Sequence, residues 1–153
     1  MKRLVLLLLF VAAPAFASEI TNASVVAAMN EQRAQFGLAP LRENSRLDAA
    51  AADRMRDMEE LSYWGHESPD GRSPFMWLAL RRYPFRFAGE NLATGFETTE
   101  LLLDGWMGSK GHRENILSPD YEDCGVAIID GGTVKRSPGK SVVVMFGSVR
   151  PEP

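Results

Sequence analysis

The sequence contains very little cysteine and histidine. Cys124 is the only cysteine among 153 residues, and His66 and His112 are the only histidines. A single thiol cannot form an internal disulfide, which excludes the disulfide-rich scaffolds common among small secreted proteins. Because apolar residues flank Cys124, we expect it to be a small buried hydrophobe. Hydrophobic residues make up 45% of the chain, enough for the core of one ordinary globular domain.

A hydrophobic run long enough to span a bilayer is also absent. The N-terminal apolar stretch, Leu4 to Ala13, follows the basic pair Lys2 and Arg3 and is too short to cross a membrane. Ala15-Phe16-Ala17 then provides the small-x-small pattern of a cleavage site. The N-terminus therefore predicts a signal peptide that is removed during export, with no membrane span left after cleavage.

The expected division of the chain is a signal peptide over residues 1–17 and one domain over residues 18–153, in a protein that is secreted or periplasmic. Without Lys2 and Arg3, 15 of the 17 basic residues remain against 20 acidic ones, a net charge of −5. An acidic domain without a basic run is a poor partner for nucleic acid or anionic lipid surfaces. We therefore expect no nucleic-acid partner.

Four segments combine helical spacing of apolar residues with capping residues at their starts. In the second of them, the residues expected on the buried face are Leu47, Ala51, Met55 and Met58. Four charged residues of the same segment are expected on its exposed face: Asp48, Asp53, Arg54 and Arg56. The expected helices run from Thr21 or Asn22 to Phe36, from Ser45 to about Leu61, from Pro74 behind the capping residue Ser73, and from about Thr99 to Met107.

Two apolar runs near the C-terminus predict strands, Cys124 to Ile129 and Ser141 to Val149. Neither run alternates polar with apolar residues, so both faces of each strand should be covered. A sheet that is apolar on both sides needs helices above and below it. The sequence therefore predicts the α/β class and, within it, a single-domain, three-layer α/β/α sandwich.

Most of the polar residues that could perform chemistry lie in three segments that we expect to be loops. His66 belongs to "GHESPDGRSPF", where Ser68-Pro69-Asp70-Gly71 suits a type I turn. Glu90 belongs to "AGENLATG", and His112 belongs to "GWMGSKGHRENILSPDYEDCGVAI". The two histidines are far apart in the sequence, and no helical or hairpin spacing forces them together. Spacing alone therefore leaves open whether they form one site or are ordinary exposed side chains.

Four longer motifs follow one another along the chain. They are "MNEQRAQFGLAPL" (29–41), "GHESPDGRSPF" (65–75), "AGENLATG" (88–95) and "GWMGSKGHRENILSPDYEDCGVAI" (105–128). In these motifs and their order, the sequence resembles the CAP superfamily, which joins cysteine-rich secretory proteins, antigen 5 and pathogenesis-related proteins. It is most similar to the short, secreted bacterial members, over nearly the whole mature chain. The resemblance implies the family's SCP domain, an α/β/α sandwich, in agreement with the expectation from the two strands.

The resemblance also implies a site. In the family, two histidines and two acidic residues converge in a central cleft, and by position His66, Glu90 and His112 match three of them. The second acid, in family members that have it, stands three residues after a tryptophan, and that position is Ser109 here. The resemblance therefore implies a binding cleft formed by His66, Glu90, His112 and Ser109, in which the fourth corner lacks its acid.

Such a site could hold a metal ion. Two neutral imidazoles can ligate a divalent transition metal, and zinc is the natural candidate. Glu90 can either complete a ligand set with His66 and His112 or orient one ring from behind. Three protein ligands would leave an open position for water or a substrate oxygen, as in a metal-assisted hydrolase. Ser109 weakens that alternative, since a hydrolase needs a general base beside the metal-bound water.

Three functions remain open at this point. The first is an exported binding domain for a small ligand, a lipid or a cell-wall fragment, with or without a divalent metal. The second is a metal-dependent hydrolase that acts on an extracellular polymer or peptide. The third is a protein–protein interaction domain whose cleft is vestigial. Family resemblance does not choose among them, because one scaffold can host unrelated functions.

Overall fold

The computed structural model describes residues 18–131 and 138–149. The predicted signal peptide, residues 1–17, lies outside the described residues and stays a prediction. Within the described ranges, no helix is both long enough and apolar enough to cross a membrane.

A four-stranded sheet forms the middle of the domain, with the strand order β1-β3-β4-β2. β1 pairs with β3 in parallel, while β3 pairs with β4 and β4 with β2 in antiparallel fashion. The predicted strand from Cys124 falls within β3, and the one from Ser141 falls within β4, so both predictions are confirmed. The strands are β1 Arg42–Glu43, β2 Phe85–Phe96, β3 Asp123–Asp130 and β4 Lys140–Val149.

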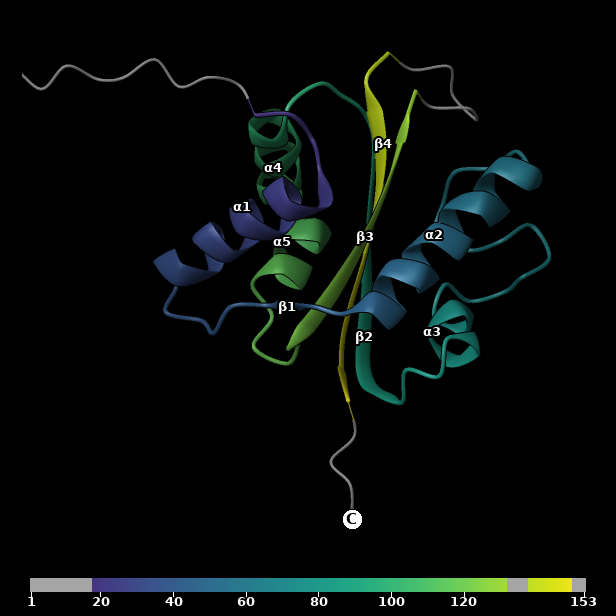
Figure 1. The fold of residues 1–153 in the computed structure, drawn as a ribbon, viewed down its shortest axis with the longest axis horizontal. Coiled ribbons are helices and arrows are strands. Elements are labelled where there is room, and N and C mark those ends of the chain that lie inside the picture. The colour runs from purple at the N-terminus through teal and green to yellow at the C-terminus, as the bar shows by residue number, and fades with distance from the viewer. Residues whose placement is uncertain (1–17, 132–137, 150–153) are drawn as a thin grey trace, which may run out of the picture.

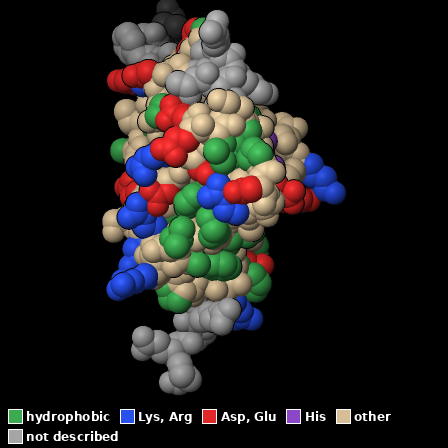
Figure 2. Space-filling view, turned by 90° about the vertical axis from the view of Figure 1, so that its right-hand side faces the viewer, with side chains coloured by type: hydrophobic (Ala, Val, Ile, Leu, Met, Phe, Trp, Pro, Cys, Tyr) green, Lys and Arg blue, Asp and Glu red, His purple; other side chains and the backbone are tan. Residues whose placement is uncertain are grey.

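Helices cover both faces of this sheet (Figure 1), which confirms the three-layer α/β/α arrangement. On one face lie α1 Asn22–Gln35, α4 Thr99–Gly108 and α5 Lys110–Ile116, and on the other lie α2 Ser45–Glu60 and α3 Met76–Leu80. The face of the molecule that carries α2 and α3 mixes acidic and basic side chains, with hydrophobic ones gathered between them (Figure 2).

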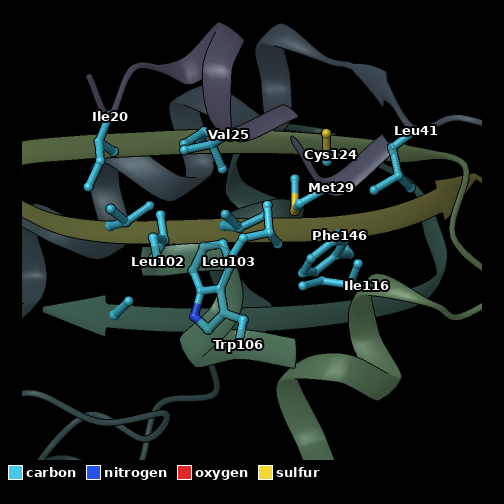
Figure 3. Close-up of a cluster of buried hydrophobic side chains, with 14 residues drawn as sticks. Ile20, Val25, Met29, Leu41, Leu102, Leu103, Trp106, Ile116, Cys124 and Phe146 are labelled. Atoms are coloured by element: carbon cyan, nitrogen blue, oxygen red, sulfur yellow. The ribbon is translucent and has the colours of Figure 1, made fainter. Parts of the chain in front are cut away.

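Strand β4 shows why the sheet needs both helical layers. Its residues Val142, Val144 and Phe146 belong to the core between the sheet and α1, α4 and α5, and Figure 3 shows Phe146 there with Met29 and Trp106. Val143 and Met145 point the other way, into the core that α2 closes. Because successive side chains of a strand point to opposite faces, an unbroken apolar run requires two cores.

Most of the helix predictions are confirmed. α1 begins after Thr21, whose hydroxyl accepts from the Ser24 backbone N–H in a capping box, and α2 and α4 begin at the expected residues. The third helix starts later than expected, at Met76, and Ser73 does not cap it. Cys124 is fully buried, as expected, and burial raises the pKa of its thiol to about 12.

Three expectations about individual residues are wrong. Glu90 lies in the long strand β2, and His112 lies in the short helix α5, whereas both segments were expected to be loops. Arg54 was expected on the exposed face of its helix, but its side chain is fully buried. This burial is possible because Glu90, Tyr63 and the Gly65 carbonyl accept hydrogen bonds from the Arg54 guanidinium.

Candidate functional site

The four residues proposed from the sequence line one cavity. It has a volume of about 730 Å³ and includes His66, Glu90, Ser109 and His112 in its wall. His66 lies in the loop after α2, Glu90 in β2, Ser109 at the junction of α4 and α5, and His112 in α5. The fold thus brings segments that are far apart in the sequence to one place. The remaining lining residues are Glu67, Gly71, Ser73, Pro74, Phe75, Ala88, Gly89, Gly111, Glu114, Asn115 and Tyr121.

The ring of His66 is oriented by Glu90. His66 Nδ1–H donates to Glu90 Oε1 at 2.8 Å, and the His66 side chain is 58% exposed while that of Glu90 is only 2% exposed. The hydrogen bond to this carboxylate is the main cause that raises the pKa of His66, and partial burial opposes it. Because Nδ1 is engaged with Glu90, Nε2 is the His66 nitrogen that can meet a ligand.

Arg54 holds the other side of the Glu90 carboxylate. Its Nε–H donates to Glu90 Oε2 at 2.9 Å, and its remaining nitrogens donate to the Tyr63 hydroxyl and the Gly65 carbonyl. Since a buried charge is costly unless it is paired and hydrogen-bonded, these contacts explain how Arg54 can be fully buried. Arg54 therefore fixes the Glu90 carboxylate, which in turn orients His66. The hydrogen bond from Arg54 to the Gly65 carbonyl also fixes the backbone directly before His66.

Asp57 anchors the loop that carries His66. Its carboxylate accepts hydrogen bonds from the hydroxyls of Ser68, at 2.9 Å, and Tyr63. The same carboxylate also accepts from Arg72 Nη2 at 2.9 Å and lies 3.5 Å from Arg54 Nη1. The expected turn closes by a hydrogen bond from the Gly71 N–H to the Ser68 carbonyl at 2.8 Å. One buried polar network thus joins α2, the histidine loop and β2.

Arg54 is not among the site residues expected from the sequence, although its spacing is informative. Arg54 follows Leu47 by seven residues and precedes Met58 by four, which places it on the same face of α2 as the core residues. The charge alone suggested exposure. A basic residue that lies inside an apolar stripe is therefore a signal that its side chain is buried against polar partners.

His112 is positioned by amides from β2 and α5. The Asn91 side chain donates to the His112 carbonyl at 3.1 Å, and the Asn115 side chain donates to the Glu90 carbonyl at 3.1 Å and to Asn91 Oδ1 at 2.9 Å. These bonds fix α5 against β2. Burial lowers the pKa of His112, and the neighbouring charge of His66 lowers it further.

The two imidazoles therefore differ in their proton affinity. Glu90 favours the protonated form of His66, whereas burial favours the neutral form of His112. The contribution of the His66 charge to the His112 shift also indicates that the rings interact electrostatically. As the pH rises, His112 is therefore expected to lose its proton before His66 does.

Ser109 stands where the family pattern would have its second acid. It is the N-cap residue of α5, and its hydroxyl forms no capping hydrogen bond there. Two other acids, Glu67 and Glu114, line the same cavity and are exposed. The fourth corner of the cleft is thus a small hydroxyl, and two exposed carboxylates lie elsewhere in the cavity wall.

The geometry of the site agrees only in part with the metal-ligand set proposed from the sequence. His66 and His112 line the same cavity, but both oxygens of Glu90 are already engaged by His66 and Arg54. Among the described residues, no group of three or more histidine, cysteine or acidic side chains is arranged to hold a metal ion. The contacts of Glu90 favour the orienting role over direct ligation.

Comparison with known proteins gives a family match over most of the chain. Residues 26–146 match the family model described as CAP, the cysteine-rich secretory protein family. The chain is 36% identical over 110 residues to "Uncharacterized protein YkwD" of Bacillus subtilis (strain 168), covering 72% of this chain and 43% of that protein. The chain thus spans less than half the length of the curated relatives it matches.

Solved structures of other bacterial proteins are similar in fold. An extracellular SCP-domain protein from Bacillus anthracis superposes with a TM-score of 0.70 at 25% sequence identity, covering 82% of this chain and 39% of that one. An outer surface protein from Borrelia burgdorferi superposes with a TM-score of 0.73 at 20% identity, covering 88% of this chain and 100% of that one. The second likeness concerns the fold alone.

Proposed function

Because the chain belongs to the cysteine-rich secretory protein (CAP) family, we propose that it is an exported domain that binds a small polar ligand between His66 and His112. One observation carries this proposal: residues from three distant segments line a single cavity of about 730 Å³. The buried Arg54 and Glu90 support it, since they fix the His66 ring at a cost in desolvation that packing alone would not require.

Export is supported by the N-terminus and by the relatives. Residues 1–17 have the pattern of a signal peptide. The SCP-domain protein of Bacillus anthracis is extracellular, and the similar protein of Borrelia burgdorferi is an outer surface protein. A location outside the cytoplasm, secreted or periplasmic, places the cleft where extracellular polymers and their fragments occur.

The chemistry of the cavity wall favours a polar ligand over a lipid. Pro74, Phe75 and Ala88 contribute apolar surface, but most of the other lining residues carry hydroxyl, amide, carboxylate or imidazole groups. A volume of about 730 Å³ is within the usual range of small-molecule pockets. Fragments of bacterial cell wall, which carry sugar hydroxyls, amides and carboxylates, match these donors and acceptors.

A zinc ion would be held by the two imidazoles. His66 Nε2 and a nitrogen of His112 are the ligands the chain offers, and Glu90 would act behind His66 as its hydrogen-bond acceptor. The ion would supply a Lewis acid for an oxygen of the ligand. Because the pKa of His66 is raised, its proton competes with the ion, and the affinity for zinc should increase with pH.

Hydrolysis is the second candidate. It is favoured by the opposite pKa shifts of His66 and His112, since an acid and a base held apart in this way are a common catalytic arrangement. Ser109 remains the weak point of this candidate, because the family's second acid is replaced there by a hydroxyl.

Titration of the purified mature domain tests the binding function. Soluble cell-wall fragments and zinc chloride are added separately to isotope-labelled protein at pH 8, and NMR shifts are followed. We expect shifts at residues of the cavity wall such as Gly89, Ser109 and Gly111. For zinc, each of His66→Ala and His112→Ala should lower the affinity at least about tenfold, because a direct ligand is lost.

Arg86→Ala is the control, since Arg86 is an exposed residue of β2 that is not part of the cavity wall. It should leave both titrations unchanged. Binding of neither probe by the wild type, or equal binding by all four proteins, would contradict the proposed function. Release of product from the fragments would instead support the hydrolase candidate.

A further inference from the structure

The first residue that the structure describes is bound to a helix on the far side of the domain from α2. The backbone nitrogen of Ser18 lies 3.2 Å and 3.1 Å from the two carboxylate oxygens of Glu100, and the Ser18 hydroxyl donates to Glu100 Oε1 at 2.7 Å. Glu100 lies in the first turn of α4. The pKa of Glu100 lies below its usual range, chiefly because the Ser18 hydroxyl donates to it.

Further hydrogen bonds and burial hold the segment from Ser18 to Ile20 in place. The Ser18 carbonyl accepts from the Thr99 N–H at 3.1 Å, and the Glu19 carbonyl accepts from the hydroxyls of Ser24 and Thr99. Ile20 is 1% exposed and belongs to the core between the sheet and α1. The segment from Ser18 to Ile20 is therefore an integral part of the α1–α4 side of the fold.

The arrangement around the Ser18 nitrogen suits an ammonium better than an amide. An amide has one N–H, which must be shared between two oxygens at nearly equal distances. An ammonium has three N–H groups and a full positive charge, so it can donate to both oxygens, and charge-assisted bonds of this kind are stronger. Ser18 is also the residue that the sequence places directly after the expected cleavage site.

We propose that export processing between residues 17 and 18 creates a Ser18 α-ammonium that docks on the Glu100 carboxylate and completes the α1–α4 side of the domain. A signal peptidase supplies the reaction: water is added across the peptide bond, and a carboxylate forms on residue 17 and an ammonium on Ser18. The docking site is thus a processing-dependent contact, and it does not depend on what the cleft binds.

The surrounding charges favour a cation at this position. The small cavity beside Ser18 is lined by the acids Glu31 of α1 and Glu100 and Asp104 of α4. Glu19 is acidic as well, although Lys140 Nζ lies 3.5 Å from it. A free α-amino group normally has a pKa of about 7.7 to 8.0, and this acidic setting should raise it.

The identity of the mature N-terminus is the first test. The full-length chain is produced in a bacterium that exports it, and the exported protein is analysed by N-terminal sequencing and intact mass. We expect a single species that begins at Ser18. A mature chain that begins at another residue, or a chain that keeps residues 1–17, would overturn the proposal.

The α-amino pKa is the second test. NMR titration of the mature protein with labelled Ser18 should give a value above about 8. Glu100→Gln should lower that value towards the unperturbed range, whereas Glu97→Gln, at an exposed acid three residues earlier, should not. An α-amino pKa that is unaffected by Glu100→Gln would overturn the docking.

Stability gives an independent readout. A variant with one added glycine before Ser18 keeps every side chain but displaces the ammonium, and its melting temperature at pH 7 should be about 1 to 4 °C lower. A group whose pKa is raised by folding contributes stability below its unfolded pKa, and this contribution is lost as pH rises through the folded pKa. The difference should therefore disappear at alkaline pH, and a constant difference at all pH values would contradict an ammonium contact.

Discussion

Arg54→Met is expected to lower the free energy of unfolding by about 3 to 5 kcal/mol. The substitution keeps much of the volume but leaves the buried Glu90 and Asp57 without the cation between them. It also leaves the Gly65 carbonyl without its donor. Chemical denaturation of the mature domain, followed by circular dichroism, measures the loss.

Arg56→Met on the same helix is the control. The Arg56 side chain is 61% exposed and pairs with Asp53 at 3.2 Å, so its removal should change stability by no more than about 0.5 kcal/mol. Adding Glu90→Gln to Arg54→Met should cost less than the sum of the two single changes, because the Glu90 carboxylate is then no longer buried without its cation. A cost below about 1 kcal/mol for Arg54→Met would show that the network does not depend on Arg54.

Gly125→Ala is expected to cost at least about 3 kcal/mol, at or above the upper end of the usual overpacking range. A β-carbon at Gly125 would lie 2.1 Å from the Leu47 carbonyl carbon and 2.2 Å from the Asp48 nitrogen. Both atoms belong to the backbone of α2, so the helix itself would have to move. Such a shift would also strain the hydrogen bond from the Val126 N–H to Asp48 Oδ1, which is 2.9 Å long.

Gly108→Ala provides the contrast for this substitution. Gly108 is the last residue of α4, and a β-carbon there would meet no atom within 4 Å apart from its chain neighbours and the nearby backbone of its own helix. Because alanine favours the helix over glycine, this change should be neutral or stabilising by up to about 1 kcal/mol. The pair is compared by the same denaturation measurement, and equal effects of the two changes would contradict close contact between α2 and β3.

The layered fold followed from particular residues of the sequence. The run from Val142 to Phe146 has no polar position on either face, and such a strand can only be buried between two layers. Strand β2 gave no such signal. Its centre contains Gly89, Glu90 and Asn91, residue types that are uncommon in strands, and tertiary pairing with β4 overrides that preference.

The site was predictable to a lesser degree. The family motifs indicated His66, Glu90 and His112. A resemblance to a family indicates which residues lie close together in the fold, whereas their spacing along one chain does not. Arg54 was hidden, since its role depends on Glu90, which is 36 residues away in sequence. Burial of a charge depends on a partner from another element, and a pattern confined to one helix assigns that charge to the surface.

The protonation of the two histidines tests the shared cleft most directly. The chain has no other histidine, so NMR titration of the imidazole carbons and nitrogens of the mature domain gives two assignable curves. One ring should titrate above the usual pKa of about 6.5 and the other below it, and His66→Gln should move the His112 pKa upwards as the neighbouring charge is removed. Two rings that both titrate near 6.5, with His112 indifferent to His66→Gln, would show that the imidazoles do not share one site.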